Sequence, residues 1–363
     1  MKKELAFQIP FSGYAGTTFI NCFASMYLFL ENIKVTGEAG YRCDYREKGY
    51  CSQCDSCRKT PVAMQERYFF VFDTMCGCSS LRWRFDGTPT QMQLLISDPD
   101  YDDGGTDNNV EFLFGFAGYE YQQLTDPSVF REKIKAAIDT GKPILIRVKS
   151  GGARFRVITG YDADTLICPD FGSAQTVPCY EELDVLYIIG KKTAPRYTFL
   201  DGLKRIRRVM EYNQEEKLWD GYMEKIGLYG PEGLGEASLE EKKVRMKRVA
   251  DTMWFTFNSH NFAEVFRQRN VQELKSPVFD EICRKIGAPL YGYTHDLAWS
   301  VIGLEECADW GKHYAGYWGE MVQLTLRQIR DNDSAVLEEV KRMIEILEEQ
   351  RRMGKMKIWC WRV

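Results

Sequence analysis

The sequence has few histidines and little excess of charge. Only three histidines occur among the 363 residues, and none lies before residue 260. A catalytic triad built within the first half of the chain is therefore excluded. The net charge of -4 at pH 7 is mild and evenly spread, which argues against a nucleic-acid partner or an anionic membrane surface.

Long apolar segments are also missing. The longest apolar run, residues 19–30, is too short and too interrupted to span a bilayer. The opening stretch MKKELAFQIPFSG reaches Pro10 and Gly13 before any sustained apolar segment, unlike a signal peptide. We therefore expect a cytoplasmic protein with no membrane partner, whose cysteines stay reduced.

Cysteine, by contrast, is abundant, with 12 residues, and four of them cluster in YRCDYREKGYCSQCDSCRKT. These four are Cys43, Cys51, Cys54 and Cys57, spaced C-x7-C-x2-C-x2-C. Four closely spaced thiolates suit a structural zinc ion, which would stabilise a loop that has almost nothing apolar to bury. The spacing resembles, in reverse order, the zinc lobe of medium-chain alcohol dehydrogenases. An iron–sulfur cluster and a metal-free loop are the alternatives.

The pattern of secondary structure changes near residue 195. Before it, β-branched and aromatic segments predict strands at 67–75, 142–150, 154–162, 164–170 and 184–192. The segment DPSVFREKIKAAIDTGKP predicts an amphipathic helix between them. After Pro195 the patterns are helical, so we predict an α+β domain over residues 1–195 and an all-α domain over 196–363.

Two helix starts stand out in the second half. Ser238 and Glu241 fit a capping box for a long helix, and Asp333 or Ser334 is expected to cap the last helix. The last helix should carry one apolar face, formed by Leu337, Val340, Ile344 and Leu347.

The stretch GTTFINCFASMYLFLEN predicts a buried helix with Cys22 near its start. Unpaired amides and the helix macrodipole stabilise a thiolate at such a position and lower its pKa. Cys22 therefore has the position of a nucleophile. A small buried thiol without a chemical role is the alternative.

These features together resemble the papain-like cysteine peptidase superfamily. The similarity lies in Cys22 near the start of a buried helix, followed about 130 residues later by a helix, adjacent strands and the motif VITGYD…DTLICPD. Within that superfamily the chain is similar to bacteriocin leader peptidases and to the N-terminal domain of butirosin biosynthesis protein H, an acyltransferase-related family. The resemblance covers about residues 10–192. It implies an N-terminal helix packed on an antiparallel sheet, and a peptide or small-molecule acyl substrate.

Carried over position by position, the resemblance implies that Cys22 is the nucleophile and that Asp170 is the acid that orients an imidazole. The position of the catalytic histidine is occupied by Arg154. The expected oxyanion-hole glutamine is also missing, which leaves Thr18 and Asn21 as polar side chains near Cys22.

Arginine cannot act as the base, because its guanidinium stays protonated. A base would have to come from the helical half, from His260, His295 or His313. His295, which stands beside Asp296 after a glycine-containing aromatic segment, is the one least expected to be buried. The first functional hypothesis is thus a cysteine-dependent peptidase or acyltransferase. The second is a catalytically degenerate domain in which Arg154 binds a peptide or small anionic ligand. The third is a scaffold formed by the helical half, and the oligomeric state is left open.

Overall fold

The computed structural model describes part of the chain. The described residues are 2–7, 18–33, 64–82, 84, 88, 90–92, 108–149, 155–169, 179–225, 237–238, 240–241, 244 and 323–354. They fall into two compact units. Unit 1 comprises the described residues within 1–42, 60–72 and 110–197, and unit 2 those within 73–109 and 198–363. The predicted border at residue 195 stays a prediction.

Unit 1 contains two antiparallel sheets. The larger has the order β2 (Tyr119–Leu124), β7 (Leu183–Lys192), β3 (Ile144–Val148), β4 (Phe155–Ile158). The smaller has the order β1 (Lys2–Glu4), β5 (Gly160–Asp162), β6 (Thr165–Ile167). All pairings are antiparallel, with Leu145 opposite Val157 in one sheet and Tyr161 opposite Leu166 in the other.

Helix α7 (Pro127–Asp139) covers one face of the larger sheet. It begins with Asp126 as N-cap, whose carboxylate accepts a hydrogen bond from the Ser128 amide at 3.0 Å. Its buried stripe of Phe130, Ile134 and Ile138 packs with sheet residues that include Ile144 and Ile146. This is the 3.6-residue periodicity of an amphipathic helix on a core, as predicted.

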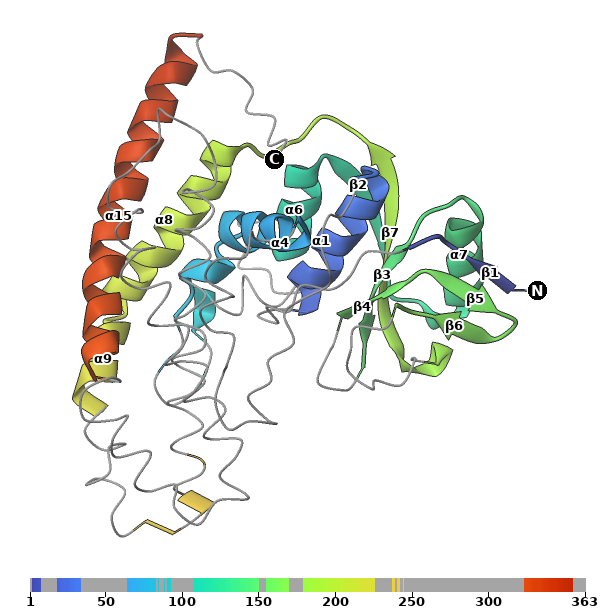
Figure 1. Ribbon diagram of the computed structural model, residues 1–363, viewed down its shortest axis with the longest axis horizontal. Helices are drawn as coiled ribbons and strands as arrows, with labels where there is room; N and C mark the ends of the chain where they lie inside the picture. The colour runs from blue at the N-terminus through green and yellow to red at the C-terminus, as the bar shows by residue number, and fades with distance from the viewer. Residues whose placement is uncertain are drawn as a thin grey trace. The chain divides into compact units, whose positions relative to one another are not determined.

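Helix α1 (Thr18–Leu30) lies on the opposite side of that sheet from α7 (Figure 1). Phe19 meets Phe155 of β4 edge-on, with ring centroids 5.1 Å apart. Phe23 makes edge contacts at 5.0 and 5.1 Å with Phe72 of α4 (Met64–Met75) and Phe114 of α6 (Asn109–Ala117). An apolar helix surrounded in this way is buried on most of its faces, which matches the expectation for residues 19–30.

The described part of unit 2 is helical. It contains η1 (Cys78–Ser80), α8 (Phe199–Glu215), α9 (Leu218–Lys225) and α15 (Gln323–Arg352). Helices α8 and α15 run side by side in Figure 1. The predicted apolar face of the last helix is confirmed, because Leu337, Val340, Ile344 and Leu347 are all buried. The capping box is confirmed too, with Glu241 N–H donating to Ser238 Oγ at 3.3 Å and Ser238 N–H to Glu241 Oε2 at 3.1 Å.

The α+β class is therefore confirmed, with an N-terminal helix, antiparallel sheets and C-terminal helices. Two expectations were wrong. Residues 67–75 belong to helix α4 rather than to a strand, because a continuous apolar run in RYFFVFDTM fits a fully buried helix as well as a buried strand. The last helix begins at Gln323, so neither Asp333 nor Ser334 is its cap.

Candidate functional site

Cys22 lies in unit 1 at the start of the second turn of α1, and its side chain is 0% exposed. Burial raises the pKa of its thiol well above the usual range, and the neighbouring Cys168 raises it further. The positive charge of Arg156 acts in the opposite direction. Since burial is the largest of these effects, Cys22 is a neutral thiol near pH 7.

The charge of Arg156 acts on this thiol. The resemblance to papain-like peptidases pointed to Arg154 instead. In the β3–β4 ladder Arg156 is paired with Ile146, which belongs to the core under α7. Phe155, one residue earlier, faces α1 through Phe19. The side chains of successive strand residues alternate between faces, so the charge of Arg156 acts on Cys22 through space, from the other face of β4.

Cys168 follows β6 and is partly buried beside the same core. Burial raises the pKa of its thiol to about 12, and the charge of Arg156 lowers it. Arg156 therefore exerts a positive potential on two thiols of unit 1, Cys22 and Cys168. The resemblance assigns a role to Asp170 in the segment CPDF, and nothing in that segment marks Cys168 as a neighbour of Cys22.

The other predicted site residues are only partly described. Thr18 is the first residue of α1, and Asn21 is buried next to Cys22 in the same helix. The remaining predicted residues lie outside the described part of the chain: Arg154, Asp170, His295, Cys43, Cys51, Cys54 and Cys57. The roles assigned to these residues stay predictions.

A metal centre has no support from the residues that the structure describes. Among them, no group of three or more histidine, cysteine or acidic side chains is arranged to hold a metal ion. The four cysteines of the predicted zinc loop are outside these residues, so the zinc site stays a prediction.

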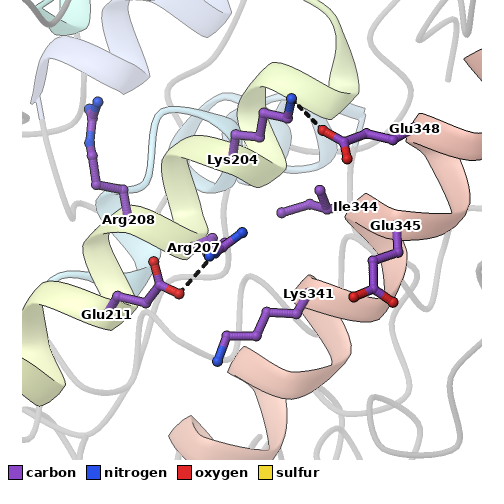
Figure 2. Close-up of a pocket in the computed structure, with 8 residues that line it drawn as sticks. All are labelled: Lys204, Arg207, Arg208, Glu211, Lys341, Ile344, Glu345 and Glu348. Atoms are coloured by element: carbon purple, nitrogen blue, oxygen red, sulfur yellow. Dashed lines mark hydrogen bonds and ion pairs between the residues drawn. The ribbon is translucent and has the colours of Figure 1, made fainter.

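Unit 2 has a groove of about 570 Å³ between α8 and α15, shown in Figure 2. Its lining residues are Lys204, Arg207, Arg208, Glu211, Lys341, Ile344, Glu345 and Glu348. Lys204 bonds Glu348 at 2.6 Å across the groove, and Arg207 bonds Glu211 at 2.8 Å along α8. None of the eight is a histidine, cysteine or serine, and seven of them carry charged side chains of both signs.

In the part of the chain that is described, no helix has both the length and the apolar character needed to cross a membrane. Comparison with known proteins finds no matching family model, and no curated protein or solved structure with significant similarity. The resemblance to papain-like peptidases therefore rests on the sequence motifs alone.

Proposed function

We propose that unit 1 is a catalytically inactive papain-like domain that binds a carboxylate-bearing peptide or small anion next to Arg156. The observation that carries this proposal is the complete burial of Cys22, together with the raised pKa of its thiol. A cysteine that attacks a peptide or acyl group must meet that bulky substrate as an accessible thiolate, and burial opposes both conditions. The absence of histidine before residue 260 supports the same conclusion.

The anionic nature of the ligand follows from the chemistry of arginine. The guanidinium of Arg156 acts electrostatically on Cys22 and Cys168, so a positive potential reaches this edge of unit 1. A planar guanidinium can hold a carboxylate with two parallel hydrogen bonds, and it stays charged at every physiological pH. Arg154, two residues earlier in the chain, lies outside the described residues, and its role in binding an anion stays a prediction.

The second candidate is a cysteine-dependent peptidase or acyltransferase. It is favoured by the position of Cys22 close to the N-terminus of α1 and by the opposing effect of Arg156, which lowers the pKa of the thiol. This enzyme would need a conformation in which Cys22 is exposed. It would also need a base from outside the described residues. His295 keeps that role as a prediction.

Alkylation of Cys22 distinguishes the two candidates. The folded protein is treated with iodoacetamide between pH 6 and pH 9.5, and the modification of each cysteine is followed by mass spectrometry of peptides. The inactive domain predicts slow alkylation of Cys22 at every pH, with full reactivity only in denaturant. Rapid alkylation below pH 8 would instead show an accessible thiolate and favour the enzyme.

Binding is tested with a pool of N-acetylated pentapeptides that carry a free C-terminal carboxylate, and with the same pool amidated. Retention of each pool by the protein is measured after ultrafiltration. The proposal predicts retention of the carboxylate pool alone, reduced about tenfold or more by Arg156→Gln, since hydrogen bonds to charged groups contribute about 1.5–3 kcal/mol. Arg131→Gln, which removes an exposed cation paired with Asp164, is the matched control and should leave retention unchanged. Equal retention of both pools would contradict the proposal.

A further inference from the structure

Unit 2 holds a second pair of thiols, in the segment TMCGCSS at the end of α4. Between the two cysteines, Gly77 adopts the left-handed conformation with φ 88° and ψ 2°, which favours glycine. The turn is fixed by hydrogen bonds from Gly77 N–H to Thr74 O at 2.9 Å and from Ser80 N–H to Gly77 O at 3.1 Å. This geometry brings Cys76 and Cys78 together, with a distance of 3.4 Å between their sulfur atoms.

Polar side chains contact both cysteines. Asn109 Nδ2 lies 3.8 Å from Cys78 Sγ, as a donor to the sulfur. The Nε of the buried Arg205 donates to Cys76 O at 2.8 Å. Contact with Cys76, followed by burial, raises the pKa of the Cys78 thiol, while the Arg205 charge lowers it. The raising effects, which include the charge of Asp73, outweigh that of Arg205, so the Cys78 thiol loses its proton less readily than a free thiol.

We propose that Cys76 and Cys78 form a redox-active dithiol that a small peroxide oxidises to an intramolecular disulfide. A disulfide needs about 2.05 Å between sulfur atoms, and these two are already in contact across a single residue. The burial of the two cysteines limits the size of the oxidant. Cys76 is 0% and Cys78 7% exposed, so Cys78 is the more accessible of the two, and so little exposure favours a small oxidant such as hydrogen peroxide over a protein.

Hydrogen peroxide would oxidise the two thiols in two steps. One thiol of the pair loses its proton, and its sulfur attacks a peroxide oxygen, which breaks the O–O bond and forms a sulfenic acid. The leaving hydroxide takes up a proton as water. The second thiolate then attacks the sulfenic sulfur and expels a second hydroxide, which is also protonated to water. Two thiols and one peroxide thus give one disulfide and two water molecules, with two electrons passing from sulfur to oxygen.

The disulfide would close a very short loop across Gly77. Such a bond is strained relative to a structural disulfide, and strained disulfides are more readily reduced. We therefore expect glutathione to restore both thiols. The pair would act as a reversible peroxide-sensitive group rather than as a permanent crosslink.

The test uses the folded full chain and a slight molar excess of hydrogen peroxide. Free thiols are then blocked with iodoacetamide and the protein is digested with trypsin. Cleavage after Arg67 and Arg82 yields residues 68–82, which contain both cysteines and no others. The expected product is this peptide, unblocked and two hydrogen atoms lighter than the dithiol form, and treatment with glutathione before blocking should abolish it.

Two variants complete the test. Cys76→Ser should abolish the lighter peptide and leave Cys78 as a sulfenic or sulfinic acid, whereas Cys168→Ser, which removes a thiol of unit 1, should leave its yield unchanged. Two results would overturn the proposal. One is a wild-type peptide that remains doubly alkylated after peroxide treatment, and the other is a disulfide that forms only in denaturant. Both readouts use the wild-type chain, so they hold even if Cys76→Ser fails to fold.

Discussion

The guanidinium of Arg82 and the carboxylate of Asp333 form a two-point ion pair within unit 2, although 251 positions separate them in the sequence. Arg82 Nε lies 3.0 Å from Asp333 Oδ2, and its Nη2 lies 2.7 Å from Oδ1. The indole N–H of Trp219 donates to Oδ2 at 2.8 Å, and the Arg82 guanidinium is 5.7 Å from the centroid of the indole ring. Arg82 is only 2% exposed, so Asp333 compensates a buried charge.

Asp333→Asn should destabilise unit 2 strongly, because it leaves the Arg82 guanidinium buried without its counter-ion. Loss of one partner of a buried pair costs about 3–5 kcal/mol in the free energy of unfolding. The matched control is Glu338→Gln on the same helix, which breaks an exposed pair with Lys341 and should cost less than about 0.5 kcal/mol. Urea unfolding followed by helical circular dichroism measures both changes. Similar midpoints for the two variants would contradict the role assigned to Asp333.

Asp333 also illustrates what could be predicted from the sequence. Aspartate and serine favour the N-cap, so residues 333 and 334 suggested a helix start. The structure instead places Asp333 inside α15, where its carboxylate binds Arg82. Local preference is visible in a sequence, but a partner 251 positions away is not. The periodic face of the same helix was predicted correctly, since it depends only on the spacing of apolar residues.

The same distinction applies to the site in unit 1. The helix that carries Cys22 was predicted from its apolar composition, and it is present as α1. The exposure of the thiol and the effect of Arg156 on its pKa depend on tertiary packing, which local sequence patterns do not reveal. Strands β1 and β2 were missed for a related reason: KKE and YEYQQL are polar segments that become strands only because β5 and β7 pair with them.

Two glycines of unit 2 should respond in opposite ways to alanine. A Cβ at Gly202 of α8 would lie 2.6 Å from Met75 Sδ and 3.2 Å from Met75 Cβ, so Gly202→Ala should destabilise by about 1–3 kcal/mol through overpacking. A Cβ at Gly221 of α9 meets no atom within 4 Å. Gly221→Ala should therefore stabilise by about 0.5–1 kcal/mol, because alanine favours the helix. Thermal unfolding of both variants tests the difference in sign, and a stabilised Gly202→Ala would refute the close contact.

The N-terminus of α8 depends on a capping box. Thr198 N–H donates to Asp201 Oδ2 at 2.7 Å, and Asp201 N–H donates to Thr198 Oγ1 at 3.4 Å. Thr198→Ala removes the side-chain acceptor and should cost about 1 kcal/mol, whereas Thr198→Ser should retain most of the stability. Thr193→Ala is the control, because the exposed Thr193 hydroxyl donates to Ala194 O outside any helix. Equal urea midpoints for both alanine variants would show that the cap contributes nothing.

The hydroxyl of Tyr121 on β2 donates a hydrogen bond to Glu111 Oε2 at 2.8 Å. Partial burial raises the pKa of this phenol well above its usual value, and the bond to the Glu111 carboxylate raises it further. Above about pH 10 the unfolded chain loses this proton while the folded chain keeps it. The stabilisation is therefore complete below about pH 10 and is lost progressively as the pH rises toward the pKa of the folded state.

Tyr121→Phe should accordingly have two effects, one on the free energy of unfolding and one on its dependence on pH. At pH 8 it should lower the free energy of unfolding by about 1 kcal/mol, through loss of the hydrogen bond to Glu111. Between pH 10 and pH 11.5 it should lessen the dependence of that free energy on pH, because one phenol no longer titrates on unfolding. Urea unfolding across this range measures both effects. Tyrosinate absorbance should show one fewer late-ionising phenol in the folded variant than in the folded wild type. Tyr119→Phe, which removes a similar bond to Glu31, should act additively. An unchanged slope in Tyr121→Phe would mean that Tyr121 ionises normally in the folded chain.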